Sequence, residues 1–140
     1  MRIGIVVSEW NPEITSALYS AAHETLLNCG AQTNNIIRLD VPGSFELTLG
    51  AQYLCRKKVD AVICLGCVIQ GETKHFDLIC DAVANGLTEV GLKFNLPVIF
   101  GVLTTNDMQQ AIDRAGGKHG NKGTEAALTA IRMVALKKKS

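Results

Sequence analysis

The chain of 140 residues has the length of one ordinary domain, and its 47% hydrophobic and 19% charged residues exclude a mainly disordered state. We therefore expect a single domain over residues 1–140. Lys and Arg number 14 against 13 Asp and Glu, and this near-balance argues against a protein that binds nucleic acid or anionic membrane. No apolar run approaches the roughly 18 residues that a membrane span needs. Five cysteines, an odd number scattered through apolar segments, are typical of reduced thiols, so we expect a cytoplasmic protein.

Four apolar runs predict β-strands. They are rich in Val and Ile and show no alternation with polar residues, which is typical of strands that are buried on both faces of a parallel sheet. In chain order, the predicted strands are Ile3–Val7, Ile36–Val41, Ala61–Cys67 and Val98–Thr104.

Helical patterns lie between and after these strands. Asn11 is expected to cap the first helix, with Pro12 in its first turn, and Pro97 ends the third helix before the next strand. The segment Asn106–Gln109 resembles a capping box that opens the fourth helix. In chain order, the predicted helices run from Pro12 to Gly30, from about Phe45 to Lys57, from about Phe76 to Asn95, from Asn106 to about Ala115–Gly117 and from Thr124 to Leu136.

The alternation of strand and helix predicts an α/β fold: a doubly wound three-layer α/β/α sandwich around a four-stranded parallel sheet, with flavodoxin-like order. Ligands of such folds bind beyond the carboxyl ends of the strands. The four segments that follow the predicted strands are therefore the places to look for a site. They are Ser8–Asn11, Pro42–Glu46, Val68–His75 and Thr105–Asn106.

The third of these segments overlaps a motif with the spacing of a phosphate-binding P-loop, Gly66–Thr73. Glu72 stands where such a loop requires Lys, and its charge would repel a nucleotide, so an NTPase is excluded. Backbone N–H groups and Thr73 could still hold one smaller phosphate, with an ordinary strand-to-helix turn as the equal alternative. His75 ends this loop and could move protons near neutral pH, although a lone histidine is more often structural or exposed.

Cys64 and Cys67 have C-x-x-C spacing, which invites a redox or metal interpretation. Three steps along a strand separate the two Cα atoms by about 10 Å and point the side chains to opposite faces. A disulfide needs Cα atoms less than roughly 7 Å apart, and a zinc site would need a second pair of ligands. The sequence therefore favours two structural thiols and predicts no metal site.

Three cations spaced by four residues, Arg114, Lys118 and Lys122, lie in a glycine-rich segment. Such a segment allows a close approach to an anion, with solvated surface as the alternative. Trp10 could stack on a planar ligand, and its alternative is a half-buried core residue. His23 and His119 have no evident partner, and we assign them no function.

Four motifs in this order and spacing resemble the 6,7-dimethyl-8-ribityllumazine synthase family over nearly the whole chain. The family condenses 5-amino-6-(D-ribitylamino)uracil with 3,4-dihydroxy-2-butanone 4-phosphate in the penultimate step of riboflavin biosynthesis. The resemblance implies that this chain catalyses the same reaction, through an imine and with release of phosphate and water, without metal or organic cofactor. The motifs are Val41–Glu46, Leu65–His75, Pro97–Thr105 and Arg114–Gly123.

The resemblance also implies roles for individual residues. His75 resembles the catalytic proton shuttle. The residues implied for the pyrimidine ring and ribityl chain are Trp10, Asn11, Ser44, Glu46, Val68, Ile69, Phe100 and Lys122. Those implied for the phosphate are Gly71, Glu72, Thr73 and Arg114.

The resemblance further implies a homopentamer with active sites at the subunit interfaces, where Phe100, Arg114 and Lys122 come from the neighbouring subunit. It leaves open whether the pentamers assemble into an icosahedral shell. Two other functions are possible on the same scaffold: a non-catalytic flavin or lumazine carrier, and a purely structural assembly protein. The retained Glu46, His75, Arg114 and Lys122 argue against both.

Overall fold

The computed structural model describes residues 1–71 and 75–140. In these ranges the main sheet is parallel and has the order β2-β1-β3-β4. The predicted α/β class and the flavodoxin-like strand order are confirmed. The four strands are β1 (Ile3–Ser8), β2 (Ile36–Val41), β3 (Ala61–Ile69) and β4 (Val98–Thr105).

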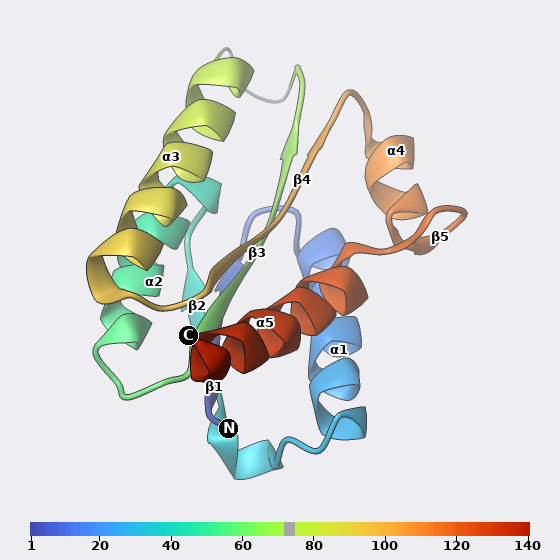
Figure 1. Cartoon of the computed structure of the whole chain (residues 1–140). Helices are drawn as coiled ribbons and strands as arrows, with labels where there is room; N and C mark the ends of the chain where they lie inside the picture. Colours follow the sequence, from blue (N-terminus) through green and yellow to red (C-terminus); the bar gives the residue numbers. More distant parts are fainter. Residues whose placement is uncertain (72–74) are drawn as a thin grey trace.

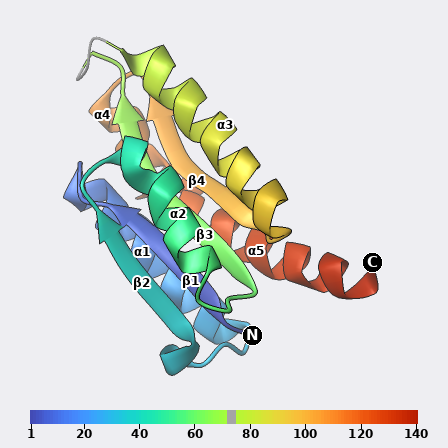
Figure 2. The ribbon, with the colours of Figure 1, turned by 90° about the vertical axis from the view of Figure 1, so that its left-hand side faces the viewer.

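Helices cover both faces of the sheet, so the molecule has three layers (Figure 1). One layer contains α2 (Leu47–Cys55) and α3 (Phe76–Phe94), which lie in front of the sheet in Figure 2. The opposite layer contains α1 (Pro12–Asn28) and α5 (Lys122–Lys139). No helix in the described ranges is long and apolar enough to cross a membrane. The smaller elements are the 3-10 turns η1 (Thr33–Asn35) and η2 (Ser44–Glu46), helix α4 (Met108–Asp113) and strands β5 (Ala115–Gly117) and β6 (Gly120–Asn121).

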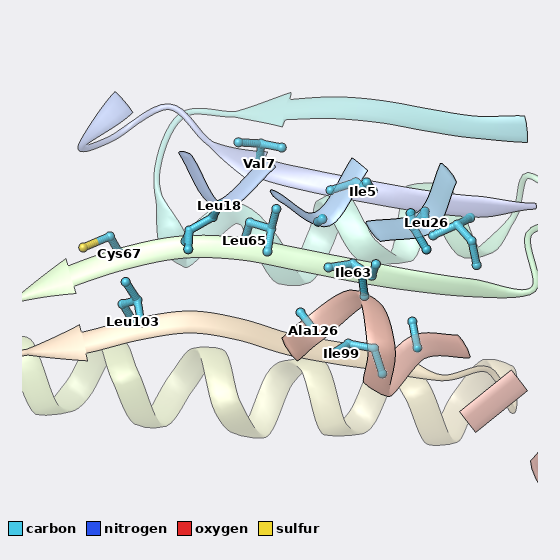
Figure 3. Packing of buried hydrophobic residues seen from close by; sticks show 14 of the residues in the cluster. Ile5, Val7, Leu18, Leu26, Ile63, Leu65, Cys67, Ile99, Leu103 and Ala126 are labelled. Atoms are coloured by element: carbon cyan, nitrogen blue, oxygen red, sulfur yellow. The ribbon is translucent and has the colours of Figure 1, made fainter. Parts of the chain in front are cut away.

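Each face of the sheet has its own hydrophobic core. Alternate residues of β1, β3 and β4 point to one face of the sheet and pack against α1 and α5. Figure 3 shows this for Ile5, Ile63 and Leu103. The residues between them point to the other face, and those such as Val6 and Val62 pack against α2 and α3. Both central strands are buried along their whole length, because each has a neighbouring strand on either side and helices above and below.

The two outer strands correct the prediction of uniform burial. β2 is mostly half-buried or exposed, and its Arg38 and Asp40 form an exposed ion pair with Nε–Oδ1 at 2.7 Å. On β4, Phe100 keeps 36% of its surface exposed. Both strands lie at an edge of the sheet, and the strand order rather than the local apolar pattern decides which strands are edges.

Several predicted helix boundaries were also wrong by a few residues. The second helix begins at Leu47, because Ser44–Glu46 first forms a 3-10 turn. The last helix begins at Lys122, where the Asn121 side chain caps it by accepting a hydrogen bond from the Gly123 N–H at 2.7 Å. The glycine-rich link before it forms the small antiparallel β5–β6 hairpin.

The helix caps use other groups than expected. The cap of α4 is Asp107 rather than Asn106: the Asp107 carboxylate accepts from the Gln110 N–H, and the Gln110 side chain accepts from the Asn106 N–H, both at 2.8 Å. Asn11 occupies the N-cap position of α1, but its side chain makes no capping hydrogen bond to the helix. Its side-chain amide instead donates a hydrogen bond to the backbone near the end of β3.

Candidate active site

The carboxyl ends of β1, β2 and β3 enclose a cavity of about 160 Å³ on the α2/α3 side of the sheet. We call it the aromatic pocket. The predicted residues Trp10, Ser44, Glu46 and Val68 all line it, so the fold brings together segments that are far apart in the chain. Its full lining is Trp10, Gly43, Ser44, Phe45, Glu46, Cys67, Val68 and Ile79.

Two aromatic side chains of this pocket are largely exposed to solvent. Trp10 is 58% exposed and Phe45 is 62% exposed. The alternative that Trp10 is a half-buried core residue is therefore wrong. An exposed indole at the mouth of a small cavity is suited to stack on a planar ring.

Ser44 lines the pocket, but its hydroxyl is directed at the sheet. Its Oγ is buried without a hydrogen-bond partner among the described residues, as is the Oγ of Ser8. A Cβ placed on Gly66 would lie 2.7 Å from the Ser44 Oγ, so this glycine makes room for the hydroxyl. In this arrangement Ser44 can offer a ligand its backbone more readily than its hydroxyl.

Asn11 connects two of the loops that form the pocket. Its backbone is left-handed, with φ of 59°, and its Nδ2 donates a hydrogen bond to the carbonyl oxygen of Cys67 at 3.1 Å. The loop that carries Trp10 is thereby attached to the end of β3, next to Val68. The geometry makes Asn11 a residue that positions the pocket.

A second cavity, of about 440 Å³, lies at the carboxyl end of β4, beside α4 and the start of α5. We call it the polar cavity. The predicted Arg114 and Lys122 both line it, whereas Lys118 is not among its lining residues and His119 is. The sequence analysis assigned no function to His119 and so missed its place at this cavity. The signal in the sequence was the pair of glycines, Gly117 and Gly120, that flank Lys118 and His119 and are typical of a tight turn. The lining residues are Val102, Leu103, Thr104, Thr105, Gln110, Asp113, Arg114, His119, Lys122 and Glu125.

The two cavities have no lining residue in common. The helical elements around them lie in different layers: α3 and η2 beside the aromatic pocket, α4 and α5 beside the polar cavity (Figure 1). Phe100 lines neither cavity and lies on the edge strand β4. One chain thus separates the predicted site residues into two groups.

The remaining predicted residues lie around the end of β3. The Ile69 side chain is buried in the α1/α5 core, so only its backbone can face a ligand. Gly71 is exposed with φ of 91°, and His75 is exposed at the N-cap position of α3. Glu72 and Thr73, predicted to bind phosphate, lie outside the described residues.

The two cysteines of the C-x-x-C motif, Cys64 and Cys67, are both buried. Cys64 packs in the α2/α3 core and Cys67 in the α1/α5 core, so the prediction that they point to opposite faces is confirmed. Burial raises the pKa of the Cys64 thiol far above its usual range, with a smaller contribution from Cys55, and this keeps it protonated. In the described ranges no group of three or more His, Cys, Asp and Glu could hold a metal ion.

An open parallel sheet with an aromatic pocket and a polar cavity at its carboxyl edge is typical of α/β proteins that bind small molecules. Residues 1–138 match the family model described as 6,7-dimethyl-8-ribityllumazine synthase. Proteins with that name include one from Cytophaga hutchinsonii, 70% identical over 94% of this chain and 84% of its own length, and one from Flavobacterium johnsoniae, 55% identical over 99% and 74%. One from Bacteroides fragilis is 53% identical over 96% and 94%. The chain belongs to the 6,7-dimethyl-8-ribityllumazine synthase family and is an enzyme of that family.

Proposed function

We propose that the chain condenses 5-amino-6-(D-ribitylamino)uracil with 3,4-dihydroxy-2-butanone 4-phosphate to 6,7-dimethyl-8-ribityllumazine, in the cytoplasm and as the penultimate step of riboflavin biosynthesis. The observation that carries this proposal is the pairing of the two cavities at one edge of the sheet. An exposed indole suits the planar pyrimidine, and a cavity with two cations suits the phosphate.

The aromatic pocket would bind the ribitylaminouracil. Trp10 stacks on its ring, while Glu46 and the Ser44 backbone hold the ribityl hydroxyls. Backbone groups of Val68 and Ile69 bind the polar edge of the pyrimidine. Asn11 contributes by holding the Trp10 loop on β3.

The polar cavity would supply the charge for the second substrate. Arg114 forms bidentate hydrogen bonds to the phosphate, and Lys122 adds a second cation beside it. Gly71, Glu72 and Thr73 would also bind the phosphate, as the family resemblance implies.

The reaction needs orientation and proton transfers. The uracil amine attacks the ketone, and loss of one water gives the imine. Elimination of phosphate follows, and ring closure with loss of a second water gives the lumazine. His75 would carry protons between these steps, and most of the acceleration would come from holding two substrates in register. No organic cofactor or metal is required by this sequence of steps.

We further propose that the active form is a homopentamer, alone or as part of a larger shell, in which the aromatic pocket of one subunit faces the polar cavity of its neighbour. The separation of the two cavities within one chain supports this, because a single ligand must reach both. Large exposed apolar side chains, such as Leu92 at 78% and Leu78 at 66%, also favour burial against another copy. Phe100, on the edge strand, would then join the neighbouring site.

The direct test is to mix the purified protein with both substrates and follow the absorbance and fluorescence of the lumazine above the slow spontaneous reaction. We expect rapid formation in the wild type, a large loss in Arg114→Ala and little change in the matched control Lys118→Ala, whose side chain lies outside the polar cavity. Tight binding of the lumazine without turnover, in a protein of confirmed assembly, would instead establish a carrier.

The shared site has its own test, complementation between two inactive variants. Trp10→Ala damages the aromatic pocket and Arg114→Ala the polar cavity, and both side chains are exposed, so folding is spared. When both chains are co-expressed and assemble at random, about one quarter of the sites receive an intact half from each of two neighbours. We expect activity to return to about that fraction. Activity no higher than that of the two variants purified separately and mixed without exchange would show that each chain builds its own site.

A further inference from the structure

The β5–β6 hairpin brings one more titratable side chain to the polar cavity. The two strands are joined through Lys118 and His119, and Figure 1 places β5 next to α4. Of these two tip residues, only His119 lines the cavity. The hairpin therefore brings one of its two tip residues to the cavity and leaves the other out of the lining.

Backbone hydrogen bonds fix this arrangement. The His119 N–H donates to the carbonyl of Asp113 at 2.7 Å, and the Lys122 N–H donates to the carbonyl of Arg114 at 2.8 Å. The two ends of the glycine-rich segment are thus held side by side, and His119 lines the same cavity as Arg114 and Lys122.

The charges of the other lining residues sum to zero. Arg114 and Lys122 contribute two positive charges, and the Asp113 and Glu125 carboxylates contribute two negative ones. One Asp113 oxygen is already engaged, because it accepts a hydrogen bond from the Gln109 amide at 2.9 Å. With neutral imidazole the lining has no net charge, and protonation of His119 makes it positive.

We propose that His119 is a third anion-binding side chain of the polar cavity and that its protonation strengthens anion binding there. Imidazole is the side chain whose charge ordinarily changes between pH 5 and 8, so the cavity would hold a dianion more tightly at the acidic end of that range. The identity of the anion as the phosphate of the second substrate rests on the proposed function. The assignment of His119 to the cavity does not.

The consequence for the proposed reaction is a response to pH. The phosphate is bound as part of the substrate and leaves as a free anion during the reaction. A protonated His119 would favour capture of the substrate, and the neutral form would favour release of the free phosphate. His119 would therefore act on the Michaelis constant for the phosphate substrate more than on the chemical step.

The test uses sulfate as the probe, because sulfate remains a dianion from pH 5.5 to 8.0 whereas phosphate itself titrates in this range. Binding is measured by calorimetry on the assembled protein without substrates. We expect wild-type affinity for sulfate to be about 30-fold higher at pH 5.5 than at pH 8.0, the effect of one added positive charge on a dianion at roughly 4 Å in water. The His119→Gln variant should lose this difference, and His119→Lys should bind tightly at both pH values.

Two comparisons separate His119 from the other groups that titrate. Lys118→Gln removes a charge from the same hairpin tip outside the cavity lining and should keep the wild-type pH response. His75, Asp113 and Glu125 are unchanged in every variant, so their contribution to sulfate binding is common to wild type and His119→Gln. An unchanged pH response in His119→Gln, with Arg114→Gln losing sulfate affinity, would overturn the assignment of His119. Sulfate binding is read without catalysis, so this outcome is distinct from a failure to form lumazine.

Discussion

The contact between Gly66 and Ser44 allows a quantitative test of how the aromatic pocket is built. A Cβ on Gly66 would lie 2.7 Å from the Ser44 Oγ, 3.0 Å from the Leu47 Cδ1 and 3.6 Å from the Ser44 Cβ. Gly66→Ala therefore overpacks this region, and overpacking costs about 1–3 kcal/mol in the free energy of unfolding. The Ser44 hydroxyl is the main obstacle, because the Leu47 methyl group can move.

Removing that hydroxyl should reverse most of the cost. Ser44→Ala alone deletes a buried oxygen without a described partner, so we expect the protein to be unchanged or stabilised by about 1 kcal/mol. In the double variant, the nearest atom of residue 44 is its Cβ at 3.6 Å, an ordinary contact. The coupling between the two substitutions should therefore be about 1–2 kcal/mol.

The assay is urea denaturation followed by circular dichroism at one fixed protein concentration, because association of subunits makes apparent stability depend on concentration. The control is Gly101→Ala, whose Cβ would lie 2.8 Å from the Cys64 carbonyl oxygen and should cost the same with or without Ser44→Ala. The reasoning is refuted if Gly66→Ala costs the same in both backgrounds to within about 0.5 kcal/mol, since independent sites are additive to that extent.

Substitutions at three other positions test a buried, a tightly packed and a strained residue of the fold. The raised pKa of Cys64 in the folded state implies stability that is complete below pH 9.0 and is lost as pH rises above it, at up to about 1.4 kcal/mol per pH unit. Urea midpoints from pH 8 to 10.5 should fall less steeply in Cys64→Ala than in wild type, and an unchanged slope would contradict this. The control Cys29→Ala, at an exposed position, should keep the wild-type slope. Gly123→Ala would drive a Cβ into the carbonyl of Leu18 on α1, so it should lower the free energy of unfolding by at least about 3 kcal/mol. A melting temperature within 2 °C of wild type, which corresponds to about 0.5 kcal/mol, would be evidence against this packing. Asn11→Gly keeps the left-handed backbone and Asn11→Ala strains it, so Ala should be less stable than Gly by about 1 kcal/mol in the same assay, and equal stabilities would count against strain.

The strands were predictable because a strand that is buried on both faces requires a continuous run of apolar residues, and β1 and β3 are buried along their whole length. Exposure at β2 and β4 was not predictable from the same runs. An edge strand is defined by its missing neighbour, and the neighbours follow from the order of the whole sheet. The exposure of Phe100 is a consequence of that order rather than of its local sequence.

The candidate site was predictable to the level of loops and less so to the level of atoms. The rule that ligands bind beyond strand ends pointed to Trp10 and Glu46, because both follow apolar runs, and the structure brings both to the aromatic pocket. It could not show that the Asn11 amide would bind a β3 carbonyl instead of capping its own helix, since that partner is 56 residues away. Likewise, spacing by four favoured Lys118 over His119, and only the hairpin decides which of them lines the cavity.

The separation of the two cavities follows from the way a doubly wound sheet is connected. The chain leaves β3 toward α3 on one face and leaves β4 toward α4 and α5 on the other, so these two strand ends lead to opposite layers (Figure 1). A ligand that needs both an indole and a guanidinium therefore has its two binding halves on different faces of any one chain. A ring of identical chains resolves this conflict without new residues, because the same interface then recurs at every subunit and joins unlike halves. Under the proposed function, assembly and catalysis would be coupled, and dilution that separates the subunits should abolish turnover before it unfolds the chain.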